Sequence, residues 1–433
     1  MRKQLLSGVA LLTLTMAAAT AYADQDSSAQ NVQINSVVVD AARTKLKNVQ
    51  VGGSLLDVST QAVGNTLSID NSALSADQHV QNYQVNSLAT QTAVSVVKGV
   101  ALADGDLKVN TAAVGNNTSV TVENAGDIKL RSAQSNTTSV QSAKTIVVGS
   151  ALGGAVDIST VAVGNNLNAD AQQGGVSPHG GAIIQTNGLA IQDAKTVLAP
   201  SSAIGQNGAI TVSTEAVGNN ASINGGAGKV KLYVAGQGND TAIQNATTKI
   251  IGVSSALSGA GNAVSTVAVG DNLNVAAGGA ATIAGGFPNG QLNVNSLQTA
   301  RTDIGSSGFA GKLDVQTAAL GNSANFTANG GAAKIGGFGL SGDDYAQANT
   351  HTIQAAFTSL QSVGVGGDVG VTTAAIGNAL SVVGKGTASL DAIQVNANSA
   401  QYAGAFVGPN VGIGGSLKVS TQAIGNAASV TVK

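Results

Sequence analysis

Apolar and polar residues alternate with a period of two in short stretches of the chain, as they do in a half-buried β-strand. Residues 58–63 read VSTQAV, and beyond Gly64 and Asn65 the alternation resumes at Leu67 and Ile69 with the opposite parity. Because Gly and Asn tolerate left-handed backbone angles, we interpret the Gly-Asn pair as a bend between two strands. The same pair can close a hairpin, but a corner of a solenoid is the preferred interpretation.

A motif of the form T-x-A-x-G-N recurs through the whole chain. Thr stands four residues and Ala two residues before the glycine in every copy, and Asn follows the glycine except at Asp271. The repeats lie 48 to 56 residues apart, and a fixed period of this kind is typical of a solenoid, a propeller or an array. The glycines of the eight copies are Gly64, Gly115, Gly164, Gly218, Gly270, Gly321, Gly377 and Gly425.

A second motif, N-x4-Q-x-A, lies between the copies of the first. Its first copy carries Asp40 in place of Gln. The variable segments 171–182, 276–290 and 327–345 follow copies of the first motif and are expected to be loops. The glutamines of the other copies are Gln91, Gln141, Gln192, Gln244, Gln298, Gln354 and Gln401.

These periods predict an all-β, elongated β-solenoid, built either of eight coils of about 50 residues or of sixteen coils of about 25. Stacked coils bring identical side chains about 4.8 Å apart, where amides and hydroxyls can form hydrogen-bonded ladders. Val109, Thr111, Ala113, Val120 and their equivalents are expected to point inward. The predicted structural ladders comprise the seven glutamines above together with Thr60, Thr111, Thr160, Thr214, Thr266, Thr317, Thr373 and Thr421, and with Asn65, Asn116, Asn165, Asn219, Asn322, Asn378 and Asn426.

Composition and the N-terminus indicate an exported protein. Arg2 and Lys3 precede an apolar stretch, and the residues at 21–23 read AYA, so residues 1–23 are predicted to be a signal peptide. An N-terminal anchor is the alternative, although the apolar stretch is short for a membrane span. Residues 24–433 are then a single repeat array. With 57 Gly, no Cys and only 10% charged residues, the chain is unlike a typical globular enzyme, and a net charge of −2 gives no reason to expect nucleic-acid binding.

Residues that carry chemistry are sparse and scattered. His79, His179 and His351 occupy different places relative to the motifs and show no metal-ligand spacing. The pair Asp343 and Asp344 follows a Gly-rich segment without a calcium-binding repeat around it. We therefore predict no catalytic residue, no cofactor and no metal site. The remaining acids considered are predicted to sit near strand starts, where they keep loops soluble: Asp104, Asp106, Asp157, Asp193, Asp314 and Asp368.

The repeat style resembles a known group of surface proteins. A Q/T-x3-G-N bend inside a serial strand–bend–strand repeat, rich in Gly, Asn, Gln, Ser and Ala, is similar to the curli family of secreted functional amyloids. It also resembles the curli-related holdfast-attachment proteins of stalked alphaproteobacteria, in particular the larger, anchor-type member. The resemblance extends over residues 31–433. It implies a protein of the cell surface or outer membrane that anchors or mediates adhesion, and not an enzyme.

The expected partners follow from the repeats and from this resemblance. The last repeat carries a full T-x-A-x-G-N motif within residues 417–426, and the sequence stops soon after it at Lys433. The last coil is therefore expected to dock onto another copy, a related fibre subunit or an export pore. Export is expected to need a separate outer-membrane pore, and a surface polysaccharide is a further candidate partner. The alternative function is a carbohydrate- or calcium-binding module of a surface adhesin, and a polysaccharide-cleaving β-helix enzyme is a distant third.

Overall fold

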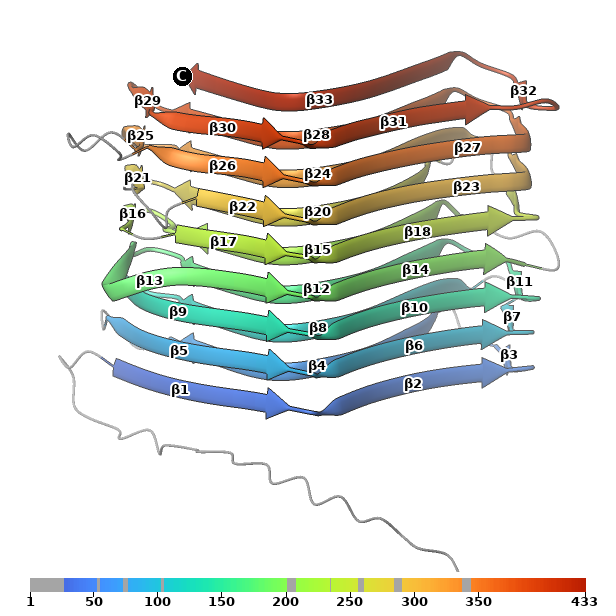
Figure 1. Ribbon diagram of the computed structural model, residues 1–433. Coiled ribbons are helices and arrows are strands. Elements are labelled where there is room, and N and C mark those ends of the chain that lie inside the picture. The colour runs from blue at the N-terminus through green and yellow to red at the C-terminus, as the bar shows by residue number, and fades with distance from the viewer. Residues whose placement is uncertain are drawn as a thin grey trace, which may run out of the picture.

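The protein is a stack of parallel β-coils. A computed structural model describes residues 27–52, 55–72, 77–102, 105–200, 208–233, 235–255, 261–283, 290–336 and 344–433. Within these ranges every regular element is a strand, and the strands of successive coils pair in parallel. Figure 1 shows the coils rising one above another from blue to red. The predicted all-β solenoid is confirmed, while the signal peptide at 1–23, Asp104 and Asp343 lie outside the described residues.

Two sheets follow each other along every coil. Sheet 1 contains β1 (Ser27–Ser36), β5 (Gln78–Ser87), β9 (Ile128–Thr137), β13 (Val176–Gly188), β17 (Ala235–Asp240), β22 (Gly290–Val294), β26 (Tyr345–Thr350) and β30 (Ala392–Ala397), with the short strands β16 (Val230–Leu232), β21 (Ala281–Ile283), β25 (Ala333–Ile335) and β29 (Ala388–Leu390). Sheet 2 contains β2 (Val39–Lys47), β6 (Thr90–Lys98), β10 (Val140–Val148), β14 (Ile191–Ala199), β18 (Ile243–Ile251), β23 (Leu297–Phe309), β27 (Ile353–Val365) and β31 (Ala400–Val407), with β19 (Ser254–Ser255) and β32 (Gly412–Ile413).

The chain then returns through a longer strand that lies opposite both sheets. Sheet 3 contains β4 (Leu55–Asn71), β8 (Asp106–Val122), β12 (Val156–Ala171), β15 (Ile210–Asn224), β20 (Gly261–Ala277), β24 (Lys312–Ala328), β28 (Val369–Gly384) and β33 (Leu417–Val432). A short sheet of β3 (Gln50–Val51), β7 (Ala101–Leu102) and β11 (Ala151–Leu152) covers the turn between sheets 2 and 3. Each coil is thus a flattened loop with its interior between sheet 3 and the other two sheets.

Like motifs stack on like motifs. Gln141 pairs with Gln91 in the coil below and with Gln192 in the coil above, and the same holds for the threonines of sheet 3. The described residues therefore form eight long coils, and the alternative of sixteen short coils is wrong. The reason is chemical: a side-chain amide pairs best with an identical amide directly above it.

The interior has two apolar ends. Val97, Leu107 and Val109 belong to the cluster between sheet 2 and the first half of sheet 3. Val120 and Leu130 belong to the cluster between sheet 1 and the second half. The inward direction predicted for Val109, Thr111, Ala113 and Val120 is confirmed, because each has at most 1% of its surface exposed. Between the two clusters, alanines of sheets 2 and 3 form a thin column in which the two layers approach closely.

The Gly-Asn pair does not act as predicted. Sheet 3 strands run through it without interruption, and the glycine has no positive φ, so the left-handed bend is a wrong interpretation. Both residues of the pair face inward in β8, at Gly115 and Asn116, and this reverses the parity of the strand as predicted. Gly is needed for space: a Cβ on Gly115 would lie 2.6 Å from the Gly164 carbonyl oxygen and 2.6 Å from Asn136 Oδ1.

The left-handed corner lies elsewhere, between sheets 1 and 2. It is occupied in successive coils by residues with φ between 50° and 56°, among them Val37, Leu88 and Thr138. Such angles are unusual for β-branched residues. The corner is held by the next coil, since the Leu88 N–H donates to the Thr137 carbonyl at 3.0 Å.

Candidate functional site

The most organised group of polar side chains lies inside the stack, between the two apolar clusters. It consists of columns of Thr, Gln and Asn that run from coil to coil along the solenoid axis. Their side chains are almost completely buried in the inner coils. Buried polar groups are stable only when they are hydrogen-bonded, so the partners of each column decide what it can do.

The threonines of sheet 3 join hydroxyls from sheet 2 in one continuous zigzag. Thr214 Oγ1 donates to Thr196 Oγ1 at 2.7 Å, Thr248 donates to Thr214 at 2.8 Å, and Thr266 donates to Thr248 at 2.7 Å. The series runs unbroken from Thr44 to Thr373. The sheet 2 hydroxyls were not among the predicted ladder residues. They follow a pattern in the N-x4-Q-x-A motif: Ser or Thr stands four residues after Gln or Asp40 in every copy except the last, which has Ala405. Thr421 lies in the last coil, paired with Thr373 along the strands.

The predicted glutamines of sheet 2 form a ladder. Gln192 Nε2 donates to Gln141 Oε1 and Gln244 to Gln192, both at 2.8 Å, and the series begins at Asp40. A second ladder in sheet 1 was missed. Its members stand two residues before the motif Asn, so the full pattern is Q-x-N-x4-Q: Gln33, Gln84, Gln134, Gln185, Gln237, Gln291, Gln347 and Gln394.

Two asparagine columns meet beside the glycines. Asn165 of sheet 3 donates to Asn219 in the next coil at 2.7 Å, and Asn136 of sheet 1 donates to Asn187 at 2.9 Å. Asn136 also donates across the interior to Asn165 at 2.9 Å. The two columns therefore form a cross-linked band of amides, and the missing Cβ of the adjacent glycine gives this band its room.

Asp271 is the exception within this band. Asn219 and Asn239 both donate to its Oδ1, at 2.7 and 2.8 Å, while its Oδ2 has no partner among the described residues. In neighbouring coils the corresponding amide nitrogen donates to a carbonyl of sheet 1, as Asn322 does to Ala348 at 3.1 Å. A protonated carboxyl can supply that missing donor, whereas a carboxylate cannot. Burial raises the pKa of Asp271 to about 8, against the opposing effect of the two amide donors.

The band therefore works as a structural element. Apart from Asp271 Oδ2, its side-chain groups are paired within the stack, and they are closed off from solvent in the inner coils. A ligand would have to break these pairs to reach them, and an unpaired buried amide costs about 1–3 kcal/mol. The paired ladder residues align like positions in successive coils.

The other polar candidates lie on the outside. His79 is half-buried and lies 3.2 Å from Lys129 Nζ, His351 occupies an exposed corner, and the side chain of His179 lies outside the described residues. Among the described residues, no three His, Cys, Asp or Glu side chains are grouped as a metal site would require.

The acids are less dispersed than predicted. Asp314 and Asp368 line one shallow depression on sheet 3, with Lys312 2.8 Å from Asp314. The backbone N–H and hydroxyl of Ser416 lower the pKa of Asp368. A carboxyl held in its ionised form has no proton to donate, so Asp368 is unsuited to the general-acid role in glycoside hydrolysis.

Comparison with known proteins gives one match. The family profile described as Holdfast attachment protein D matches residues 101–362, which is more than half of the chain. No curated protein and no solved structure matches the chain. The matched segment contains strands of all three sheets. Within the described residues, no helix is long and apolar enough to cross a membrane.

Proposed function

The chain belongs to the holdfast attachment protein D family, and from that membership we propose that it is the structural element that anchors a holdfast to the cell surface. Family membership itself gives a role in holdfast attachment and is consistent with adhesion at the cell surface. The finer proposal is that the stack transmits force between a surface partner and the adhesive material, without catalysing a reaction.

One observation supports this proposal above the others: the interior ladders are continuous from coil to coil. The hydroxyl zigzag passes through successive coils at 2.7–2.9 Å, and the backbone ladders of three sheets run parallel to it. Pulling two coils apart would break many hydrogen bonds at the same time. A rod with cooperative cross-links of this kind suits a mechanical connection.

Location and export are parts of the same proposal. The predicted signal peptide at 1–23 would direct the chain across the inner membrane, and a curli-type outer-membrane pore would carry it to the surface. Curli-like assembly is also proposed. In the coil of residues 392–433, inward-facing Thr421 and Asn426 are exposed, and a coil from another copy with the same columns could continue the ladders.

The alternative, a carbohydrate-binding module, is supported by three exposed aromatic side chains on the outer face of sheet 2, Phe357, Tyr402 and Phe406. A calcium-binding module has less support. Asp343 lies outside the described residues, and the described part of the chain contains no cluster of acids suited to a cation.

The proposal is tested by deleting the gene in its own bacterium and measuring how much holdfast stays on the cells under shear. We expect the mutant to make holdfast and to shed it, and complementation to restore retention. Retention equal to that of the wild type would contradict the proposal.

A matched pair of internal deletions adds a structural control. Removing residues 116–164 joins Gly115 to Asn165 and takes out one whole period, so the remaining columns stay in register. Removing residues 116–141 takes out about half a period and places unlike motifs on one another. We expect the first variant to retain the holdfast and the second to lose it. If the two variants are present at the cell surface in equal amounts and retain the holdfast equally well, attachment does not depend on the register of the stack.

A further inference from the structure

The outer face of sheet 2 carries a cluster of exposed aromatic side chains in its last two coils. Phe357 of β27 is 44% exposed, and Tyr402 and Phe406 of β31 are 56% and 52% exposed. The chain has only 5 Tyr and 6 Phe, so three on one small area is a marked concentration. The equivalent outer positions of the coils below carry aliphatic, small polar or charged residues, as Arg301 and Asp303 do in β23.

Strand register places these rings side by side. Phe357 pairs with Gly404, which lies between Tyr402 and Phe406 on the same outer face of β31. Gly404 leaves its backbone open to the Phe357 ring: a Cβ there would be 3.2 Å from Phe357 Cδ1. Neighbouring outward residues along a strand are about 6.8 Å apart and adjacent strands about 4.8 Å apart, so the three aromatic residues span roughly 13 Å.

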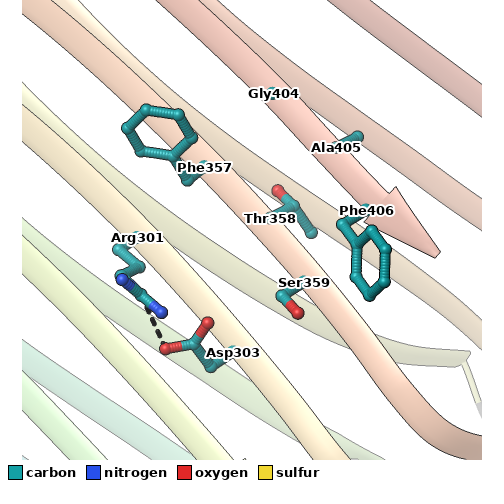
Figure 2. Close-up of a pocket in the computed structure, with 8 residues that line it drawn as sticks. All are labelled: Arg301, Asp303, Phe357, Thr358, Ser359, Gly404, Ala405 and Phe406. Carbon is teal, nitrogen blue, oxygen red and sulfur yellow. Dashed lines mark hydrogen bonds and ion pairs between the residues drawn. The ribbon is translucent and has the colours of Figure 1, made fainter. Parts of the chain in front are cut away.

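Polar groups form the other side of the same surface. Arg301 Nε donates to Asp303 Oδ2 at 2.8 Å, and both lie beside Phe357 and Phe406 in a depression of about 320 Å³. Figure 2 shows the Phe357 and Phe406 rings on either side of Ser359, with the Arg301–Asp303 ion pair on the neighbouring strand beside Phe357 and Ser359. The Arg301 side chain is 58% exposed, so its remaining N–H groups are accessible to a ligand.

This combination fits a sugar chain. A pyranose ring has one face of C–H groups that stacks on an aromatic ring and a rim of hydroxyls that bonds to charged and polar groups. An extended run of two or three such rings is comparable in length to the cluster. A protein partner fits less well, because half-exposed aromatic side chains supply on the order of 300 Å² of apolar surface, against about 800 Å² on each side of a stable interface.

We propose that Phe357, Tyr402 and Phe406, with the Arg301–Asp303 pair, form a binding surface for the saccharide chain of the material that this protein anchors. This assignment rests on the proposed attachment function, and it names the surface through which the protein contacts the anchored material. The aromatic rings stack on successive sugar rings, and Arg301 and Asp303 orient them by bonding to hydroxyl groups. The inner coils and their ladders hold the three strands of the site, β23, β27 and β31, in register.

The test uses the full chain after signal-peptide removal and holdfast material that has been freed of protein by protease digestion. Binding is measured by co-sedimentation, with cellohexaose, chitohexaose and polygalacturonate as competitors that report the class of sugar. We expect the triple variant Phe357→Ala/Tyr402→Ala/Phe406→Ala to bind at least tenfold more weakly than the wild type. Arg301→Met is expected to weaken binding by a smaller factor.

Tyr83→Ala is the matched control, because Tyr83 is an equally exposed aromatic residue, at 48%, on the outer face of sheet 1. It should bind as the wild type does, and all variants should keep the wild-type unfolding midpoint because the changed side chains lie outside the core. A wild-type chain that does not sediment with the material, or a triple variant that binds equally well, would overturn the proposal.

Two further outcomes separate this inference from its premise. If gene deletion sheds the holdfast but the triple variant still binds the deproteinised material, the attachment function stands and this binding surface is wrong. If the triple variant loses self-association in size-exclusion chromatography while its binding to the material is unchanged, the cluster is a contact between copies of the chain, and the saccharide proposal is again overturned.

Discussion

The inner and outer faces of the same strands differ in how much they vary from coil to coil. In sheet 2 the inner column through Gln244 is Gln in every coil after the first, and the adjacent column through Ala246 is Ala in every coil. The outer column one position after these alanines varies from coil to coil. It contains Val94, Lys144, Lys195, Thr247, Arg301, Phe357 and Gly404. Both faces share one backbone, so the difference comes from what each side chain meets.

An inner side chain meets the same residue in the next coil, and a change in one coil leaves its neighbours unpaired or without space. An outer side chain meets water and can change without cost to the stack. The inner face therefore sets the fold, while the outer face is free to carry binding residues at chosen coils. Four substitutions test this division, beginning with the one for which the largest effect is expected.

Gly218→Val should have the largest effect. A Cβ at this position would lie 2.5 Å from the Gly270 carbonyl oxygen and 2.6 Å from Asn239 Oδ1, and neither neighbour can move without breaking a ladder. We expect a loss of about 4 kcal/mol or more in the free energy of unfolding, measured by urea denaturation. Gly188→Val is the control, since a Cβ there meets nothing within 4 Å. Equal losses in the two variants would contradict the spatial explanation.

Stability should fall as pH rises, because of Asp271. Burial raises the pKa of its carboxyl from 3.8 to about 8, so between these values the folded chain holds a proton that the unfolded chain has released. This contribution is complete below pH 4 and is lost as the pH rises to about 8. The slope should be about 1.4 kcal/mol per pH unit within that window.

Asp271→Asn should remove this slope and raise the unfolding midpoint at pH 7, because an amide supplies the donor that the band lacks there. Asp157→Asn, at an exposed position on the outer face of β12, serves as the matched control. The free energy of unfolding is measured from pH 4 to 8 for both proteins. If the curves of the wild type and Asp271→Asn are parallel, the Asp271 carboxyl does not hold its proton in the folded chain.

Ala216→Phe should have an intermediate effect. Ala216 is fully buried in the alanine column between sheets 2 and 3. A large ring overpacks this column and should lower the free energy of unfolding by roughly 1–3 kcal/mol. An unchanged midpoint in thermal or urea denaturation would mean that this position faces solvent.

The smallest effect is expected from a pair of adjacent threonines. Thr248→Val removes one hydroxyl from the buried zigzag, where Thr248 donates to Thr214 and accepts from Thr266, and should cost about 1 kcal/mol. Thr247→Val changes the neighbouring outer residue in the same way chemically and should leave stability within about 0.5 kcal/mol of the wild type. A larger loss for Thr247→Val would reverse the assignment of the two faces.

The repeats made the fold predictable, because eight copies at a near-constant period show which positions must match. Thr60 and Gln91 could be assigned to ladders from recurrence alone. Gln84 and its equivalents recur equally strictly, and the Q-x-N pattern was available in the sequence but was not recognised. The role of Gly115 could not be derived, since its close neighbours, the Gly164 carbonyl and Asn136, come from other coils.

Other features depend on the three-dimensional register and leave no local pattern. The left-handed corner is occupied by Val37 and Leu88, residues that disfavour that angle, and it is held by bonds to the next coil. Phe357 and Phe406 are far apart in the sequence, and only the pairing of β27 with β31 brings their rings onto one surface. Asp271 looks like a conservative change from Asn until its burial is known.

The central claim is that equivalent positions of successive repeats lie directly above one another, so that the interior must repeat and the exterior need not. The chain has no Cys, so pairs of introduced cysteines can be spin-labelled without background. Asn110 pairs with Ser159, and Ser159 with Ser213, on the outer face of sheet 3. We expect Asn110→Cys/Ser159→Cys to give strong spin exchange at a backbone spacing of about 4.8 Å, and Asn110→Cys/Ser213→Cys, at about twice that spacing, to give much less. A spectrum of the first pair that equals the sum of its single-label spectra would contradict the stack of eight long coils.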